Sequence, residues 1–278
     1  MFKLRDWIDA SKLTEYLSSN PNAIQYLQQN PDKIDWRPLS TNPEAYTILN
    51  QNPEKIDWKW LSINPGAIAL LEKNPDKINW AMLSRNPNAI NLLEKNPNHI
   101  NWLWLSSNPS ALNLLKSNPD KIDWRNLSSN VSALELIKQH PERIDWENLS
   151  MNPSAIPILE TNQDKIIWNC LSWNPAASHI LEANIDKIDW FLLSTNVGAI
   201  TLIEKNLDRV NWLLLSENPA AIKILEQNQD KIRWDSFSRN PEIFEYDYKK
   251  MKQPFTEELM ANRFHPKNIG KFESWGYE

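Results

Sequence analysis

The sequence of 278 residues is poor in the residue types that most compact functional sites require. It contains one cysteine, Cys170, four glycines and four histidines. A single cysteine excludes an intramolecular disulfide, and four glycines leave little turn chemistry for a β-sandwich or for a phosphate-binding loop. The histidines, His99, His140, His179 and His265, lie in four different regions, and none has a second His or Cys at metal-ligand spacing. We therefore expect no metal, no cofactor and no enzymatic activity.

The chain also lacks a basic excess and a long apolar run. Its formal net charge is −5, whereas general binding to nucleic acid or to anionic lipid needs a basic surface. No apolar stretch approaches the roughly 20 residues that cross a bilayer. The first ten residues contain Lys3, Arg5, Asp6 and Asp9 in place of the apolar core of a signal peptide. We expect an intracellular protein that is not secreted and that binds neither nucleic acid nor membrane.

Tryptophan, in contrast, is abundant and evenly spaced. Ten tryptophans recur every 22 residues, at Trp36, Trp58, Trp80, Trp102, Trp124, Trp146, Trp168, Trp190, Trp212 and Trp234. A fixed period is typical of a tandem array, in which each unit is stabilised by its neighbours. We predict ten repeats over residues 20–239, an N-terminal capping segment over residues 1–19 and a C-terminal capping segment over residues 240–278.

Each repeat contains two half-motifs that begin with asparagine. The first half reads Asn-Pro-x-Ala-Ile-x-Leu-Leu, as at residues 86–93. Asparagine suits an N-cap, proline suits the first helical position, and the apolar residues form one helical face. We predict an α-helix of about two turns from this half.

The second half reads Asn-Pro-Asp-Lys-Ile-Asp-Trp-x-x-Leu-Ser, as at residues 118–128, and it allows two helix starts. Pro38 favours the later start, because it would lie in the first turn if Asp35 is the N-cap but deep in the helix if Asn30 is. We predict a tight turn followed by a short helix from Trp through Ser.

Together these patterns predict an all-α fold, an elongated solenoid of ten two-helix repeats about 100 Å long if each unit advances by one helix diameter. Alanine recurs once in every unit, which predicts close helix approach at that position. Asparagine opens the half-motifs at every site except His140, and we interpret this as capping or as a ladder of side chains bonded from unit to unit. A leucine-rich-repeat-like coil, with Ile-x-Trp as a short strand, is the alternative.

The repeat resembles a family of tandem 22-residue repeats that is abundant in giant DNA viruses of amoebae and algae. The resemblance rests on the string Asn-Pro-x-Ala-Ile-x-Leu-Leu-Glu-x-Asn-Pro-Asp-Lys-Ile-x-Trp-x-x-Leu-Ser, and on a tail in which Glu257-Glu258-Leu259-Met260 precedes His265-Pro266. It implies a virus-encoded protein located in the host cytoplasm, in the nucleus or in the virion. The resemblance carries no catalytic activity and no assigned binding residues.

Almost every second half-motif also contains an acidic residue directly before a basic one, as in Asp120-Lys121. Stacking of the repeats places these residues in parallel acidic and basic columns. We interpret them as helix-terminus acids and solvated lysines. A basic column that binds an extended polyanion is the alternative, although the adjacent acids weaken its field.

The best candidates for a functional surface are the two residues that follow each repeated tryptophan. They vary freely from repeat to repeat, so stacking does not demand them. In several repeats they are large and apolar: Trp60, Leu103, Trp104, Phe191, Leu192, Leu213 and Leu214. Exposed apolar patches mark contacts with partners; the structural alternative is that these residues fill space behind the core.

From these observations we predict a non-enzymatic repeat scaffold that uses this surface to hold a host or viral protein. The alternative is a structural or virion-associated component that assembles with itself. Alanine at Trp104 and Leu214 separates a binding role, in which partner capture is lost, from a core role, in which the array unfolds.

Overall fold

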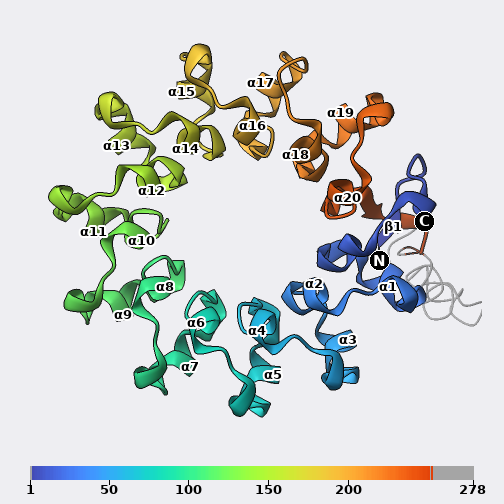
Figure 1. The fold of residues 1–278 in the computed structure, drawn as a ribbon, viewed down its shortest axis with the longest axis horizontal. Coiled ribbons are helices and arrows are strands. Elements are labelled where there is room, and N and C mark those ends of the chain that lie inside the picture. Colours follow the sequence, from blue (N-terminus) through green and yellow to red (C-terminus); the bar gives the residue numbers. More distant parts are fainter. Residues whose placement is uncertain (1, 251, 253–278) are drawn as a thin grey trace, which may run out of the picture.

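The protein forms a closed ring of short helices (Figure 1). The computed structural model describes residues 2–250 and Lys252. Within these residues, secondary structure consists of α-helices, 3-10 helices and one two-stranded sheet. The all-α solenoid class is therefore confirmed, and Ile-x-Trp forms no strand, which rules out the leucine-rich-repeat-like alternative. None of the described helices combines the length and the apolar character that a membrane span requires.

Two concentric layers of α-helices make up the ring (Figure 1). The inner layer consists of the helices that begin at the repeated tryptophans: α2 (Trp36–Thr41), α4 (Trp58–Leu61), α6 (Trp80–Leu83), α8 (Trp102–Ser106), α10 (Trp124–Ser128), α12 (Trp146–Met151), α14 (Trp168–Trp173), α16 (Trp190–Leu193), α18 (Trp212–Glu217) and α20 (Trp234–Phe237). The outer layer consists of α1 (Ile24–Gln29), α3 (Tyr46–Gln51), α5 (Ile68–Lys73), α7 (Ile90–Glu94), α9 (Leu112–Lys116), α11 (Leu134–Gln139), α13 (Ile156–Thr161), α15 (Ser178–Glu182), α17 (Ile200–Glu204) and α19 (Ile222–Gln227).

The helix starts follow the capping residues of the sequence. In the first half-motif, Asn108 accepts a hydrogen bond from the backbone N–H of Ser110, and a 3-10 turn over Pro109–Ala111 leads into α9. In the second half-motif, Asp123 accepts from the backbone N–H of Asn126, so α10 begins at the tryptophan. The later of the two predicted helix starts is confirmed. Comparable 3-10 turns, such as η11 (Pro119–Lys121), fill the tight connection before the inner helix.

The asparagine that opens the second half-motif has a different role from the one predicted. The side chain of Asn118 does not cap the turn that follows it. Its Nδ2 instead donates to the carbonyl of Leu114, 2.9 Å away, and so satisfies the C-terminal end of α9. This asparagine therefore ends the outer helix, because the last carbonyls of a helix have no partner within it.

The core lies between the two layers. In each repeat it contains the recurrent alanine, a leucine or isoleucine of the outer helix and a leucine or phenylalanine of the inner helix, as shown by Ala111, Leu115 and Leu127, all with 0% exposure. The alanine is fully or almost fully buried in every unit, which agrees with the predicted close approach at this position.

Buried polar side chains connect each unit to the one before it. The Nδ2 atom of Asn108 donates to the carbonyls of Ser84 and Asn86, both 3.0 Å away. The same pair of bonds is made by Asn20, Asn42, Asn64, Asn86, Asn108, Asn130, Asn152, Asn174, Asn196, Asn218 and Asn240. We call this set the asparagine ladder. Unit-to-unit bonding through asparagine is therefore present, as the sequence suggested.

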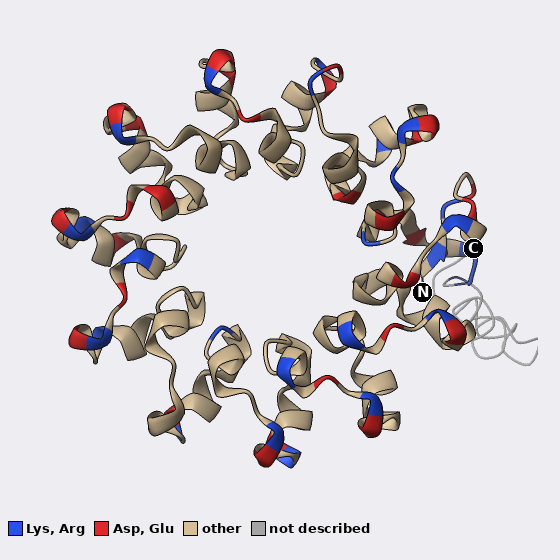
Figure 2. Cartoon of the chain, viewed as in Figure 1, with Lys and Arg blue, Asp and Glu red and all other residues tan. Residues whose placement is uncertain are grey.

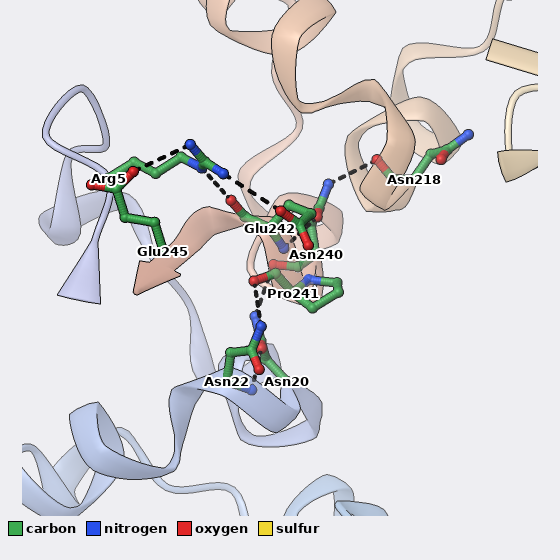
Figure 3. A network of polar contacts seen from close by, with 8 residues as sticks. All are labelled: Arg5, Asn20, Asn22, Asn218, Asn240, Pro241, Glu242 and Glu245. Atoms are coloured by element: carbon green, nitrogen blue, oxygen red, sulfur yellow. Dashed lines mark hydrogen bonds and ion pairs between the residues drawn. The ribbon is translucent and has the colours of Figure 1, made fainter. Parts of the chain in front are cut away.

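The ladder has no free end, because its first and last members are bonded to each other. Asn20 Nδ2 donates to the carbonyl of Asn240 at 2.8 Å and to that of Ser238 at 3.3 Å. Asn22 Nδ2 donates to the carbonyl of Pro241 at 3.0 Å (Figure 3). Eleven asparagines thus form a closed circle. The prediction of an elongated array about 100 Å long was wrong in its shape, since the two ends of the solenoid meet.

An eleventh unit is assembled from both ends of the chain where they meet, at a junction that we call the seam. Residues 240–243 supply the first half-motif and residues 14–19 supply the second, with Leu17 and Ser18 buried like the Leu-Ser pair of the other units. The backbone N–H of Thr14 donates to Ser238 Oγ at 3.0 Å, as the N–H of Asp123 does to Ser106 Oγ. The two terminal segments therefore complete one another, because each carries only half of a repeat.

A small sheet and a set of ion pairs fasten the seam. Strand β1 (Phe2–Leu4) pairs antiparallel with β2 (Phe244–Tyr246), with Leu4 opposite Phe244. Arg5 extends between Glu242 and Glu245, at 3.4 and 3.3 Å from their carboxylate oxygens (Figure 3). Of the predicted C-terminal capping segment, residue 251 and residues 253–278, which include the tail that supports the family resemblance, lie outside the described residues.

Candidate interaction surface on the inner helices

The candidate residues after each tryptophan all lie on the inner layer, and they divide into two classes. The first residue of the pair is exposed: Leu103, Phe191 and Leu213 have 46%, 55% and 47% of their surface accessible. The second is half-buried, as at Trp104 and Leu214. Two neighbouring positions that looked alike in the sequence therefore have different surroundings. We call the exposed and half-buried side chains of the ten inner helices, and of the one or two residues directly after each of them, the inner rim.

Successive inner helices place three large exposed apolar side chains in consecutive units. These are Trp173 at the end of α14, Phe191 in α16 and Leu213 in α18, and Trp173 is 50% exposed. We call these three residues the apolar arc. Trp173 was missed by the sequence reasoning because it stands five residues after Trp168, outside the pair that was considered. Its signal was available, since other units have Thr41, Arg85 or Ser107 at that position.

The half-buried candidates serve partly as packing surfaces. Trp60 lies beneath the guanidinium of Arg37, 5.3 Å from ring centroid to Cζ, and Trp104 lies beneath that of Arg85 at 4.6 Å. Leu192 and Leu214 are also half-buried. These four residues are the half-buried part of the inner rim, whereas Leu103, Phe191 and Leu213 are its exposed part.

The basic residues of the Asp-Lys pairs are not simply solvated. Lys121 Nζ lies 4.7 Å from the ring centroid of Trp102, in the preceding unit. The same contact places the basic residue of the next unit over Trp36, Trp58, Trp124, Trp146, Trp168, Trp190 and Trp212. His99 stacks on Trp80, and Lys12 covers Trp234 across the seam. The repeated tryptophan thus contacts a basic side chain of its neighbour by cation–π attraction. The lysines are exposed, as the interpretation of solvated lysines requires, but they also cover a tryptophan ring, which the sequence did not predict.

Charge is distributed unevenly around the inner rim (Figure 2). From α2 to α10 the inner helices and the residues directly after them carry Arg37, Lys59, Arg85 and Arg125 and no acidic residue. From α12 to α20 they carry the acidic residues Glu147, Glu217 and Asp235, with Arg239 the one basic residue. The inner rim therefore has a basic half in units one to five, and a half in units six to ten that combines acidic side chains with the apolar arc.

A surface depression lies where the basic half meets the seam. It has a volume of about 450 Å³ and is lined by Tyr16, Ser19, Asp35, Arg37, Pro38, Thr41, Trp60 and Arg239. The guanidinium of Arg239 stacks on Tyr16 at 4.2 Å, in the same manner as that of Arg37 stacks on Trp60. Two arginines, each held against an aromatic ring, thus flank this depression, which we call the seam pocket.

The remaining candidates for chemistry do not form a cluster. Within residues 2–250 and 252, no three His, Cys, Asp or Glu side chains are placed to hold a metal ion. His99 and His140 contact tryptophan rings, and His179 Nε2 lies 2.8 Å from Glu160 Oε1. His265 lies outside the described residues.

We expect Cys170 to react slowly with thiol reagents. The side chain is only 8% exposed, and burial, with a smaller contribution from Glu147 and Asp145, raises the pKa of its thiol. Because the thiolate is the nucleophile, reaction with a disulfide reagent at pH 7.5 should be at least about tenfold slower in the native protein than in denaturant. Absorbance of the released thiolate measures this rate, and rapid stoichiometric labelling of the native protein would contradict the assignment.

In comparisons with known proteins, no family model, curated protein or solved structure matches the chain.

Proposed function

We propose that the protein is a non-enzymatic binding scaffold, encoded by a virus as the repeat resemblance implies, whose inner rim holds a segment of a host or viral protein. The observation that carries this proposal is the apolar arc. Trp173, Phe191 and Leu213 expose about half of their surface each in three consecutive units. Contiguous exposed apolar groups mark protein contacts, and aromatic side chains are frequent anchors in such contacts.

The dimensions of a closed ring are compatible with a partner inside it. Neighbouring packed helices lie 8–10 Å apart, so a circle of eleven units has inner helix axes roughly 30–35 Å apart across the ring. Subtracting one helix diameter of 10–12 Å leaves an opening of roughly 20 Å. A polypeptide helix fits within that space. A closed, preformed surface also costs little further ordering on binding, which favours affinity.

A photo-crosslinking residue tests where the partner binds. We expect p-benzoylphenylalanine in place of Phe191 to form a specific adduct with one protein in the cells that produce the chain. The same residue in place of Val131, which is 42% exposed in the turn between α10 and α11, should not form that adduct. Mass spectrometry identifies the adduct, and equal adducts from both positions would contradict binding at the inner rim.

A pair of serine substitutions tests the energetic contribution of the apolar arc. We expect Phe191→Ser with Leu213→Ser to weaken capture of the crosslinked partner at least about tenfold, because aromatic and aliphatic anchors contribute about 1–2 kcal/mol or more each. The matched control is Val131→Ser with Val197→Ser, which removes two comparably exposed apolar side chains outside the inner helices. Purified partner titrated onto each variant gives the Kd, and equal weakening in the two double variants would contradict the proposal.

Self-assembly is the second candidate function, and exposed apolar residues outside the inner rim favour it. Val131, Ile185 and Val197 are each more than 40% exposed in the connections between helices. If rings associate through them, light scattering should show concentration-dependent oligomers that disappear when the three are changed to serine. A monomer at every concentration excludes this candidate.

A further inference from the structure

We propose that the basic half of the inner rim, together with the seam pocket, binds an acidic polypeptide segment. The proposal deepens the function proposed above, because it names the chemistry of a second contact on the same inner rim. It is carried by three cations that belong to no ion pair within the described part of the chain, by the stacking of two of them on tryptophan rings, and by a cavity beside them. The apolar arc takes no part in it.

Within residues 2–250 and 252, three cations on the basic half of the inner rim have no acidic partner. Among the residues that the structure describes, Arg37, Lys59 and Arg85 are exposed and belong to no ion pair. Arg125, in contrast, lies 3.5 Å from Glu147, and Arg239 lies 3.5 Å from Glu217. The three unpaired cations lie in the first three repeats and so occupy adjacent units of the ring.

Two of these three cations are held in place by aromatic rings. Arg37 is stacked on Trp60 and Arg85 is stacked on Trp104, so each guanidinium is held by the ring of the following unit. An arginine held on an aromatic face loses less conformational entropy when it forms a bidentate bond to a carboxylate. Stacking through cation–π attraction leaves the N–H groups at the guanidinium edge free to donate.

Two aspartates lie near these cations, and both are engaged in helix capping. Asp35 and Asp57 cap α2 and α4, where each accepts a backbone N–H bond at the positive end of a helix. Asp35 also lines the seam pocket. Both aspartates are half-buried, whereas Arg37, Lys59 and Arg85 are exposed. The groups that meet an approaching ligand first are therefore the cations.

An acidic polypeptide fits this surface better than a nucleic acid does. Binding of single-stranded nucleic acid depends on aromatic faces on which bases stack, and here the faces of Trp60 and Trp104 are covered by guanidinium groups. A carboxylate in the seam pocket would lie between Arg37 and Arg239, and the chain that follows it could extend over Lys59 and Arg85.

Fluorescence polarisation with a fluorescein-labelled oligoglutamate of ten residues tests the proposal on the full chain. We expect binding at low salt that weakens as salt rises, because screening reduces attraction between exposed charges. The triple variant Arg37→Ala, Lys59→Ala, Arg85→Ala should weaken it at least about tenfold. The matched control is Lys73→Ala, Lys95→Ala, Lys116→Ala, which removes the same charge from the outer layer and should change the Kd by less than about twofold.

Three outcomes would overturn the proposal. They are no binding of oligoglutamate by the native ring at low salt, equal weakening in the two triple variants, and tighter binding of a ten-nucleotide oligothymidylate than of oligoglutamate. Circular dichroism and thermal melting of each variant must match those of the native ring. Because Phe191 lies outside this surface, crosslinking at that position reports on the proposed function separately, so either proposal can fail while the other holds.

Discussion

Spin labels at Gln29→Cys and Gln227→Cys, in a Cys170→Ser background, should report a distance of roughly 30 Å, although 198 residues separate them. The two positions are equivalent residues at the ends of α1 and α19, in the first and the tenth repeat. In the closed ring only the composite eleventh unit lies between them, so they are two steps apart on the outer layer. That layer lies roughly one helix spacing outside the inner one, so each of its eleven steps spans roughly 15 Å. In an open array the same positions are nine steps apart, or at least roughly 90 Å even at one helix spacing per step.

The array provides its own reference for this measurement. Lys95 and Gln139 occupy the same position in the fourth and sixth repeats, also two steps apart but joined by continuous chain. Electron–electron resonance should give overlapping distance distributions for the pair Lys95→Cys with Gln139→Cys and for the seam pair. A seam pair with no population near the reference distance would show that the ring is open in solution.

Local structure was largely readable from the sequence, because it depends on short-range chemistry. Pro38 decided where α2 begins, since proline is tolerated in a first turn but not deep in a helix, and Asp35 is the N-cap. The buried asparagine ladder was also within reach, because an asparagine that recurs once per unit has an equivalent partner in each neighbour.

Ring closure was not readable in the same way. A circle of eleven units needs a turn of about 33° at each step, and this curvature comes from small differences in packing between the layers. A few degrees of error at each step accumulate into an open coil. The one available signal was that residues 13–19 resemble only the second half-motif, whereas residues 240–243 resemble only the first. Their complementarity predicts a shared unit as readily as two caps.

The candidate surface was only partly predictable, because exposure on a short helix depends on its neighbours. Leu213 and Leu214 are adjacent in the sequence and equally apolar, yet the first is exposed and the second is half-buried. Successive helical residues differ by about 100° in direction, and only the stacked helices on either side determine which direction is covered. The separation of the inner rim into a basic half and an acidic half also depends on the ring, because ring closure places α2 to α10 on one arc and α12 to α20 on the other.

The ladder makes a second large effect measurable. We expect Asn130→Ala to lower the free energy of unfolding by about 2–5 kcal/mol. Asn130 is 1% exposed; its Nδ2 donates to the carbonyls of Ser106 and Asn108, and its Oδ1 accepts from the N–H of Ser132. Alanine removes the buried donor to both carbonyls and the acceptor for the Ser132 N–H, although the Asn108 carbonyl still accepts from the N–H of Ala111. The denaturation midpoint measures the loss, and Asn91→Ala, an exposed substitution in α7, should change the free energy by less than about 0.5 kcal/mol.

The same substitution at the seam should have a different consequence. Asn20 makes two ladder bonds like those of Asn130, to the carbonyls of Ser238 and Asn240. These partners lie at the other end of the chain, so no short stretch of continuous chain holds them next to Asn20. Loss of those bonds in Asn20→Ala therefore favours separation of the two ends, against the remaining contacts of β1, β2 and Arg5. We expect the population near 30 Å between positions 29 and 227 to fall in Asn20→Ala and to persist in Asn130→Ala, whereas the denaturation midpoint falls in both. Equal retention of the short distance in the two variants would mean that the strand pair and the ion pairs close the ring without the ladder. The ladder would then stabilise individual units but would not determine whether the chain is a circle.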